Sequence, residues 1–452
     1  MTTDTVALPL TPWAATLPSD WHLSRIDDVA DVLFSNVDKH TLDDEGPVRL
    51  CNYVDVYKND RITRAIDFME ASAEPREITK FQIRRGDVLS TKDSETPDDI
   101  AISALVDDDL PGVLCGYHLA MMRPRSKRLH GPFLAWAHAS KQFRAQYEAR
   151  AVGVTRFGLP QYAFRAARLP LPPFHEQARI AAYLDASCAA IDAAVAAKRQ
   201  QIDTLDALRR SIVTRAMTQG LNPRAALKPS GQQWLGEIPV HWSAPCLKRL
   251  LSEPLTYGLN EAAELEDRDL PRYLRITDFD DDGALRDDTF RSLPREIARE
   301  APLAENDVLF ARSGATVGKT FMFRDYVGEA CFAGYLIRAR AQLWKLSPLF
   351  LYLFTKTTAY ESWKNLIFTQ ATIQNISAVK YNYLAVPLPP LAEQFAICEF
   401  VEERNSEFAT LSTSIGLQID TLESYRKSLI HECVIGQRRV TEADVKRAQA
   451  HG

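Results

Sequence analysis

The sequence predicts an α+β protein in which two mixed α/β domains are separated by two long helices that form an antiparallel coiled coil. Three observations lead to this prediction. A Pro-rich motif occurs twice at a fixed offset, and each copy opens a long stretch with heptad periodicity. The segments before the two copies differ from each other, although both mix short strand-like runs with loops. Together these features indicate an internal pseudo-two-fold repeat.

The composition is that of an ordinary soluble protein, with 452 residues, 25% charged and 46% hydrophobic. This length allows two or three domains with full cores. We expect no membrane span, because Asp185 and Asp192 interrupt the most apolar stretch, and no signal peptide, because the first ten residues lack a basic side chain. The expected compartment is the cytoplasm. The seven cysteines include no CxxC pair, which favours reduced thiols over disulfides or zinc.

The repeat is clearest around the Pro-rich motif. Leu169–Gln177 (LPLPPFHEQ) recurs as Val386–Gln394 (VPLPPLAEQ), and Gln201–Leu205 (QIDTL) recurs unchanged at Gln418–Leu422, both at an offset of 217 residues. The register therefore holds from the Pro-rich entry well into the following helix.

Upstream of this motif the two halves match more loosely. Three pairs remain recognisable: Leu17–Trp21 with Ile238–Trp242, Asp87–Leu89 with Asp307–Leu309, and Gly116-Tyr117 with Gly334-Tyr335. Their offsets drift by a few residues, as loop insertions and deletions would cause. A duplication followed by uniform drift is the alternative, but drift alone should not spare one segment while it diversifies the other.

Each conserved half continues as a long helix, the first predicted from Glu176 to about Met217. Proline precedes it, and Gly220 and Pro223 end it. Apolar residues spaced in sevens predict the coiled-coil seam: Leu184, Ile191, Leu205 and Ile212 in the first helix, interrupted by Lys198, and Val401, Phe408, Ile415, Leu422 and Leu429 in the second, with Leu411 and Tyr425 as further seam positions. Two amphipathic helices on separate cores are the alternative. About 40 residues give a rod of roughly 60 Å.

The predicted boundaries follow from this pattern. They are a first domain at 1–170, a first long helix at 171–220, a linker with a second domain at 221–387, a second long helix at 388–440 and a tail at 441–452. Strands are expected near 87–90, 112–115, 307–310 and 335–338, and helices near 133–151 and 348–368. Trp234, Leu235 and Ile238 are expected to pin the linker to a surface.

Basic residues gather in both divergent domains and are candidate DNA contacts. A net charge of −5 argues only mildly against DNA binding, because the position of the charges matters more than their sum. Any one such residue is more often a solvated surface charge. The candidates are Lys80, Arg84, Arg85, Arg123, Arg125, Lys127 and Arg128 in the first domain, and Arg275, Arg312, Ser313 and Lys319 in the second.

Several apparent motifs fail on inspection. Residues 313–320 (SGATVGKT) lack the first glycine of a phosphate-binding loop, although a Gly-rich loop beside Arg312 and Lys319 suits approach to DNA phosphate. Residues 171–174 (LPPF) carry leucine where the tetrapeptide of DNA amino-methyltransferases has an amide or acid. We identify no catalytic residue and no metal site.

The repeated PLPPxxEQ entries at 170–177 and 387–394, the helices they open and the repeated QIDTL resemble the specificity (S) subunits of type I restriction–modification systems. The segment at 230–242 also looks like the start of the family's second recognition domain. The segment at 307–314 resembles the same domain. The resemblance covers nearly the whole chain. Two features depart from the family pattern: the seam is interrupted at Lys198, and residues 92–94 (KDS) stand where the second domain has 312–314 (RSG).

This resemblance implies a non-catalytic subunit. Each divergent domain would read half of a bipartite site in double-stranded DNA, and the helices would dock two methyltransferase (M) subunits, which restriction/translocase (R) subunits then join. S-adenosylmethionine, ATP and Mg²⁺ would belong to these partners, so no cofactor is expected in this chain. Two other functions stay open from the residues alone: a DNA-modifying enzyme with an unrecognised catalytic centre, and a protein–protein scaffold that does not touch DNA.

Overall fold

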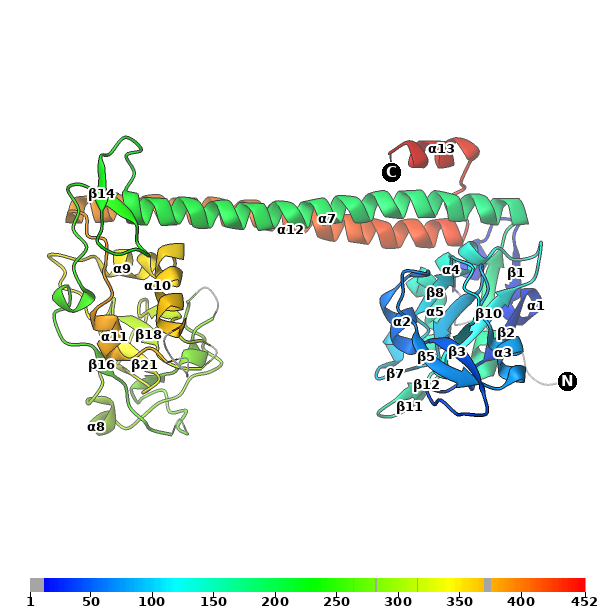
Figure 1. Cartoon of the computed structure of the whole chain (residues 1–452), viewed down its shortest axis with the longest axis horizontal. Coiled ribbons are helices and arrows are strands. Elements are labelled where there is room, and N and C mark those ends of the chain that lie inside the picture. The colour runs from blue at the N-terminus through cyan, green and yellow to red at the C-terminus, as the bar shows by residue number, and fades with distance from the viewer. Residues whose placement is uncertain (1–11, 263, 281–282, 315, 370–374, 452) are drawn as a thin grey trace. The chain divides into compact units, whose positions relative to one another are not determined.

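The computed structural model describes residues 12–262, 264–280, 283–314, 316–369 and 375–451. The chain divides into two compact units, unit 1 formed by residues 1–199 with 416–452, and unit 2 formed by residues 200–415. Each unit contains one mixed α/β domain and one section of each long helix (Figure 1). The two units are described separately.

The long helices are α7 (Phe174–Gln219) and α12 (Leu391–Val434). Each begins directly after a Pro-Pro pair, where the missing amide hydrogen of proline costs nothing. Gly220 follows α7 with a φ of 78°, and Gly436 follows the end of α12 with a φ of 77°. Glycine is favoured at such helix C-termini because it adopts the left-handed conformation without strain. The first helix is thus two residues longer at each end than the sequence predicts.

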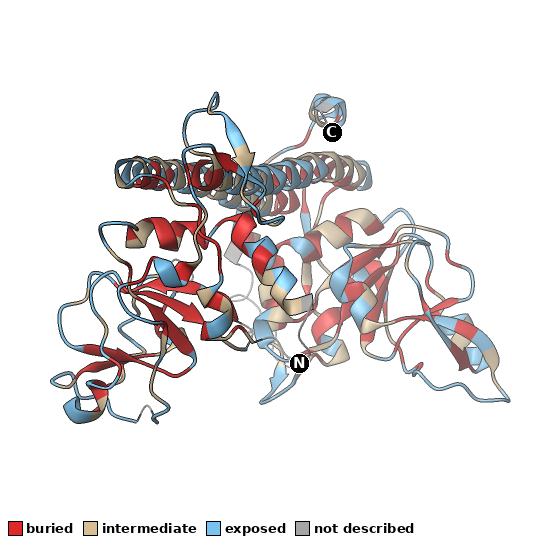
Figure 2. Ribbon diagram, turned by 60° about the vertical axis from the view of Figure 1, so that its left-hand side comes forward, coloured by how far each residue is buried: buried red, intermediate tan, exposed pale blue. Residues whose placement is uncertain are grey.

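The two helices pack against each other in an antiparallel direction within each unit. In unit 1 the start of α7 lies in one core with the end of α12, so that Leu184 and Ile191 share a cluster with Leu429. In unit 2 the end of α7 lies with the start of α12, so that Met217 shares a cluster with Val401. Figure 2 shows buried positions in the sheets and helices of both domains and on parts of the long helices. The predicted antiparallel coiled coil is confirmed.

The nine residues of the main predicted seam series all lie at buried or half-buried positions. Four of its residues are half-buried, Leu205, Ile212, Ile415 and Leu422. The other five are buried: Leu184, Ile191, Val401, Phe408 and Leu429.

The assignment of Leu411 and Tyr425 to the seam is wrong, because they are 50% and 47% exposed. The second series instead lies four residues after each member of the first. It consists of Cys188, Val195, Ile202, Arg209 and Ala216 in α7, and Asn405, Ser412, Ile419, Arg426 and Cys433 in α12, all buried or half-buried. Four of these residues are polar, Arg209, Asn405, Ser412 and Arg426, which would weaken a purely apolar coiled coil.

Helix α7 includes an 18-residue window with a mean hydropathy of 1.5, so by length and composition it passes the test for a membrane-crossing helix. The expectation that no stretch approaches a membrane span does not hold by this criterion. The structure gives a simpler reason for the hydropathy, since Ile180, Leu184 and Val195 contribute to the core of unit 1. Core helices of soluble proteins have the same composition.

The strands of unit 1 are β1 (His22–Arg25), β2 (Ala30–Phe34), β3 (Gly46–Cys51), β4 (Arg61–Ile62), β5 (Met69–Ala73), β6 (Val88–Thr91), β7 (Asp93–Ser94), β8 (Ser103–Val106), β9 (Val113–Cys115), β10 (Leu119–Pro124), β11 (Val152–Gly153), β12 (Phe157–Gly158) and β13 (Arg168–Leu171). The main sheet has the order β2-β10-β6-β8-β4, antiparallel except for β4 beside β8. A second sheet has the order β5-β3-β9, with β3 and β9 parallel. Strands β11-β12-β7 form a third sheet, and β1 pairs with β13.

The helices of unit 1 are α1 (Ile26–Val29), α2 (Tyr53–Lys58), α3 (Pro75–Phe81), α4 (Gly131–Ala139), α5 (Lys141–Glu148), α6 (Gln161–Arg165) and, in the C-terminal tail, α13 (Glu442–His451), with 3-10 turns at Pro12–Thr16 and Pro97–Asp99. Helices α4 and α5 confirm the helical segment predicted near 133–151. Val440 and Val445 bring the tail into the core of this unit.

The strands of unit 2 are β14 (Leu227–Pro229), β15 (Glu237–Pro239), β16 (Thr256–Tyr257), β17 (Arg272–Leu274), β18 (Val308–Ala311), β19 (Thr320–Met322), β20 (Ala330–Phe332) and β21 (Leu336–Ala339). Its helices are α8 (Arg295–Ala298), α9 (Pro348–Phe354), α10 (Thr358–Thr369) and α11 (Ala378–Asn382), with 3-10 turns at Leu247–Arg249 and Ile276–Asp278. The linker forms the β14–β15 hairpin. Leu235 and Ile238 are buried in the core and Trp234 packs against it, as predicted.

The two domains share a topology despite their different sequences. The antiparallel sheet β16-β21-β18-β19 of unit 2 corresponds to β2-β10-β6-β8 of unit 1, and the parallel pair β17-β20 corresponds to β3-β9. Strands β6 and β18 both begin within an Asp-Val-Leu repeat, and β10 and β21 both follow a Gly-Tyr repeat. The structure confirms the four strands predicted from the sequence, which are β6, β9, β18 and β21.

The glutamine of each Pro-rich motif fastens a domain to the start of its long helix. In unit 1, Gln177 donates from Nε2 to Pro172 O (2.9 Å) and Arg128 O (3.0 Å), and accepts at Oε1 from the amide of His130 (2.8 Å). The side chain is buried, so these bonds replace water that cannot reach the backbone groups.

In unit 2, Gln394 makes the corresponding bonds to Pro389 O (2.9 Å), Lys345 O (2.8 Å) and the amide of Ser347 (2.8 Å). We call these two arrangements the domain–helix joints. The hydrogen bonds of these joints explain why the Pro-rich motif is so similar in its two copies.

The preceding glutamate of the motif completes each joint. Glu176 accepts a hydrogen bond from Trp21 Nε1 (3.3 Å), and Glu393 accepts one from Trp242 Nε1 (3.1 Å). These tryptophans end the two loosely repeated segments found upstream. In unit 2 the glycine that follows α7 also lies close to this tryptophan. A Cβ on Gly220 would lie 3.2 Å from the Trp242 ring.

Candidate nucleic-acid interface

The Asp-Val-Leu repeat carries a buried ion pair in each domain. Asp87 accepts from Arg123 Nε (2.9 Å) and Nη2 (2.6 Å), and Asp307 accepts from Arg340 Nε (2.9 Å) and Nη2 (2.8 Å). Both aspartates are buried. The candidate Arg123 is therefore paired with the residue that directly precedes the neighbouring strand β6. Removing one partner of such a pair would leave an uncompensated buried charge.

Arg84 and Arg85 lie on the exposed turn that leads into β6. The turn is fixed by Asp87 Oδ2, which accepts from the amide of Arg84 (2.9 Å), and by Gly86 with a φ of 90°. Both arginines line a pocket of about 520 Å³ together with Arg123. The structure thus brings three of the first domain's candidates together.

The remaining candidates of the first domain lie on other parts of its surface. Lys80 is exposed at the end of α3, with Nζ 4.9 Å from the centre of the Phe81 ring. Arg125 pairs with Asp31 (2.9 Å). Lys127 and Arg128 are exposed in the segment between β10 and α4, beside the joint, because Arg128 O is one of the acceptors of Gln177.

In the second domain, Arg275 is half-buried and bonded to Asp278 (2.8 Å) and to Thr289 O (2.7 Å). Arg312 is half-buried, with its guanidinium carbon 4.7 Å from the centre of the Tyr257 ring. Ser313 forms a backbone bridge with Asn375. Thus Arg275 and Arg312 are both held in place by neighbouring groups.

Lys319, at the other end of the Gly-rich loop, has different surroundings from Arg312. It lines a large pocket formed with α7, α9, α10 and α12. The loop does not offer its Gly318 and Lys319 amides to a phosphate, since they donate to Ala311 O (2.8 Å) and Thr316 O (2.9 Å). This agrees with the rejection of a nucleotide-binding loop in the sequence.

An exposed tyrosine recurs at the equivalent place in both domains and was not recognised as a site from the sequence. Tyr335 is 65% exposed, and its carbonyl accepts from the amide of Arg312 (2.9 Å). Tyr117, the equivalent residue, is 49% exposed and has Lys92 Nζ 4.5 Å from its ring centre. A side chain at either preceding glycine would be crowded, since a Cβ on Gly116 would lie 2.9 Å from Cys51 O and one on Gly334 would lie 2.1 Å from Asn260 Oδ1.

These surfaces combine cationic groups with aromatic rings. Guanidinium and ammonium groups bind phosphate oxygens or base edges, and an exposed ring can stack on a base. Among the described residues, no group of three or more His, Cys, Asp or Glu side chains lies close enough to hold a metal ion. The Gly-Tyr repeat was the available sequence signal for these surfaces.

No family model matches the chain, but curated proteins are similar to it. The specificity subunit of the type I restriction enzyme EcoBI from Escherichia coli is 22% identical over 309 residues, covering 66% of this chain and 64% of that protein. The putative type I restriction enzyme MjaX specificity subunit from Methanocaldococcus jannaschii is 25% identical over 230 residues, covering 50% and 51%. The StySPI specificity subunit from Salmonella potsdam is 22% identical over 331 residues, covering 72% and 68%. The aligned chain spans less than two thirds of the first two relatives.

Solved structures extend the likeness to nearly the whole chain. The HsdS subunit from Thermoanaerobacter tengcongensis aligns with a TM-score of 0.56 and 19% identity, over 93% of this chain and 98% of that one. A chain from a structural study of complex assembly and conformational transition of the type I R-M system aligns with a TM-score of 0.71 and 18% identity, over 92% and 98%. In sequence this chain is therefore similar to specificity subunits of type I restriction enzymes, and in fold it resembles an HsdS subunit.

Proposed function

We propose that this chain is the DNA sequence-specificity subunit of a type I restriction–modification system and carries out no catalysis itself. The observation that carries the proposal is that one part of the repeat is alike in the two units while another part differs. The joints and the central strands are the same in both units, whereas the surfaces on those strands differ. A protein that holds two different readers in equivalent ways suits recognition of two different half-sites.

Each domain would bind DNA without chemistry of its own. Cations such as Arg312 in unit 2 and Arg84 and Arg85 in unit 1 would fix the register on phosphates, and a few side chains would read base edges. The repeated joints give each reader an equivalent attachment to its helix. The pseudo-two-fold repeat would present the domains in inverted orientation, as dimeric readers are presented to their half-sites.

The two helices would set the distance between the half-sites. Their 46 and 44 residues correspond to roughly 65–70 Å of α-helix. Their exposed faces would dock two methyltransferase subunits, and restriction subunits would complete the assembly in the cytoplasm. S-adenosylmethionine, ATP and Mg²⁺ would then serve those partners, with the target adenine flipped out of the duplex for methylation.

A domain exchange tests this proposal. Residues 15–170 are replaced by the corresponding domain of another specificity subunit, and the chimera is combined with its methyltransferase partner. Methylation-sensitive sequencing of the modified DNA should show one half-site changed and the other retained. A change in both half-sites would contradict separate readers.

The same experiment separates the two alternatives. Methylation by the isolated chain would favour a DNA-modifying enzyme. If neither the original nor the chimeric complex protects any DNA sequence, the chain is a scaffold that does not recognise DNA.

A further inference from the structure

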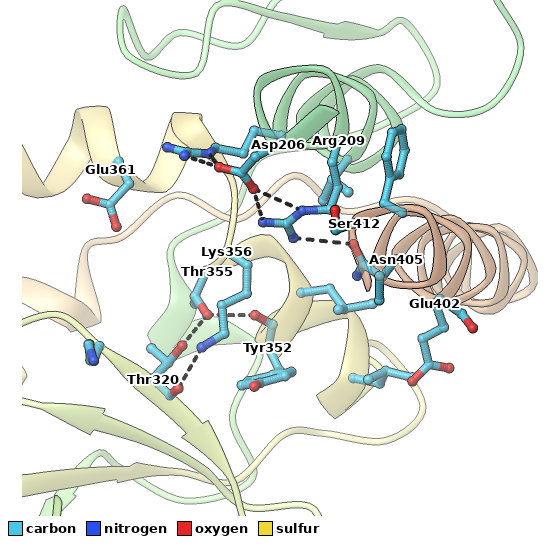
Figure 3. Close-up of a pocket in the computed structure, with 18 of the residues that line it drawn as sticks. Asp206, Arg209, Thr320, Tyr352, Thr355, Lys356, Glu361, Glu402, Asn405 and Ser412 are labelled. Atoms are coloured by element: carbon cyan, nitrogen blue, oxygen red, sulfur yellow. Dashed lines mark hydrogen bonds and ion pairs between the residues drawn. The ribbon is translucent and has the colours of Figure 1, made fainter. Parts of the chain in front are cut away.

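Unit 2 contains a pocket of about 810 Å³ between its domain and the two long helices (Figure 3). The close-up shows Asp206 and Arg209 on α7, Glu402 and Asn405 on α12, and Lys356 just after α9. Its volume falls within the range of small-molecule sites in proteins. The DNA-reading role proposed above leaves this pocket unexplained.

Cationic groups outnumber acidic groups around the pocket. Its acidic side chains are Asp206, Glu361 and Glu402. Its cationic side chains are Arg209, Arg210, Lys319, Arg324, Lys356 and Lys364.

The acidic groups neutralise only part of this charge. Asp206 is shared by Arg209 (2.7 Å) and Arg210, Glu361 pairs with Lys364 (2.7 Å), and Arg324 lies between Glu402 (3.9 Å) and Asp325 (3.7 Å). Each acidic group of the lining is thus already paired, and the lining contains six cationic side chains for three acidic ones.

Lys356 occupies a special place in this set. Although the residue is exposed, its ammonium group donates to Thr320 O (2.8 Å) and lies 4.5 Å from the centre of the Tyr352 ring. Removal of this ammonium from water, together with the nearby Lys319, lowers the pKa of Lys356 to about 8. An anion in the pocket would relieve this repulsion between like charges.

The equivalent pocket of unit 1 provides an internal comparison. At the repeat offset of 217, Asp185 stands for Glu402, Ala139 for Lys356 and Trp136 for Leu353, and all of these residues line a pocket of their own unit. Trp136 Nε1 donates to Asp185 (2.7 Å), which also pairs with Arg61 (2.6 Å).

The unit 1 pocket has a balanced charge. Its cations are Lys58, Arg61 and Arg426, and its acids are Asp60, Asp185 and Asp192. The repeat has thus kept the pocket and changed its charge in one unit.

We infer that the unit 2 pocket is a binding site for phosphate groups and that its counterpart in unit 1 is not. Several ammonium and guanidinium groups around one hollow suit the multiple oxygens of a phosphate or a pyrophosphate. The phosphates come either from the DNA backbone or from a small phosphorylated molecule. The site itself does not depend on the function proposed above.

The probe is inorganic pyrophosphate, titrated into the full-length chain by calorimetry at low salt. The wild-type chain should bind it at one site. The double variant Lys319→Gln/Lys356→Gln should weaken this affinity at least about tenfold, through loss of two charge-assisted contacts. The variant Arg210→Gln, which changes an exposed residue on α7, should also weaken it. Lys58→Gln, in the balanced pocket of unit 1, is the matched control and should leave it unchanged.

A second measurement identifies the source of the phosphates. The salt dependence of DNA binding is compared for the wild type and the double variant, each in complex with the methyltransferase partner. A shallower slope assigns the site to DNA phosphates, and an unchanged slope assigns it to a small phosphorylated ligand. The inference is overturned if pyrophosphate fails to bind the wild-type chain at millimolar concentration, or if the double variant binds it equally well. Because the calorimetry contains no DNA, its result is independent of whether the chain recognises DNA.

Discussion

Gln177 and Gln394 make the same three hydrogen bonds in the two units, to a proline carbonyl, to a second carbonyl and from one amide. Each glutamine bonds two chain segments that are far apart in sequence, the Pro-Pro entry of a long helix and the start of a domain helix. Each glutamine therefore couples the stability of its own domain to that of the long helix it lies on.

Replacing Gln394 by alanine should destabilise unit 2 by about 2–4 kcal/mol, because the buried amide of Ser347 and the carbonyls of Pro389 and Lys345 lose their hydrogen-bond partner. Urea unfolding monitored by fluorescence measures this change. Gln418→Ala, on an exposed part of α12, is the control and should change the free energy of unfolding by less than about 0.5 kcal/mol. Equal effects would rule out a special role for the joint.

The three leucines of α12 should differ in their sensitivity to truncation. Leu429→Ala should cost about 2–5 kcal/mol, because Leu429 is buried in the core of unit 1 and its truncation leaves a cavity. Leu422→Ala should cost less, since Leu422 is half-buried, and Leu411→Ala should cost below about 0.5 kcal/mol. Thermal or chemical unfolding tests the order. A large effect at Leu411 would contradict the seam described here.

The Arg340–Asp307 pair should show strong coupling in a double-mutant cycle. Arg340→Met leaves the buried Asp307 without its bidentate partner and should cost about 3–5 kcal/mol at neutral pH. Adding Asp307→Asn should recover part of this loss, because it removes the isolated charge. If the second substitution makes the protein less stable still, the charge of Asp307 is not what makes the single variant unstable.

The stability of unit 1 should fall between pH 6.5 and pH 4 because of His138. Burial lowers the pKa of His138 to about 4, whereas the unfolded chain has a value near 6.5. The unfolded state therefore takes up a proton first as the pH falls, and the contribution present above pH 6.5 is lost. The loss should approach about 3 kcal/mol.

Denaturant unfolding at pH 7 and pH 5 measures this effect. His138→Gln should reduce the dependence on pH, while His175→Gln, at an exposed position, should leave it unchanged. The same dependence in all three proteins would exclude His138 as its origin.

Arg312→Ala should weaken binding to all DNA sequences and lower the slope of log affinity against log salt by about one, if its guanidinium contacts one phosphate. Fluorescence anisotropy over a range of salt concentrations measures the slope for the complex with the methyltransferase partner. Arg286→Ala is the control, because Arg286 is an exposed arginine of the same domain paired with Asp288. An unchanged slope for Arg312→Ala would remove Arg312 from the interface.

The sequence was sufficient for the repeat, the long helices and their antiparallel pairing, because these depend on patterns within one segment. The second seam series was missed because Asn405, Ser412 and Arg426 are polar at positions where an apolar series would be sought. Tyr425, by contrast, is apolar enough to suggest a seam position that it does not occupy.

The candidate interface was harder to predict because it depends on contacts between distant segments. The role of Arg123 requires knowledge of its partner Asp87, which directly precedes the neighbouring strand β6, and a basic residue looks the same in sequence whether it is paired or solvated. Tyr335 and Tyr117 carried a signal in the Gly-Tyr repeat, but only the fold shows that their side chains are exposed.

The discontinuity of unit 1 has a consequence for the order of folding during synthesis. Unit 2 is one continuous stretch of sequence, residues 200–415. Unit 1 combines residues 1–199 with residues 416–452, which are synthesised last. A ribosome releases the first domain early, yet Leu184 and Ile191 have no Leu429 to cover them until the last helix is made. For most of translation this apolar face is open to solvent, and such surfaces are prone to association with other chains. Truncation near the C-terminus should therefore harm the domain that was made first.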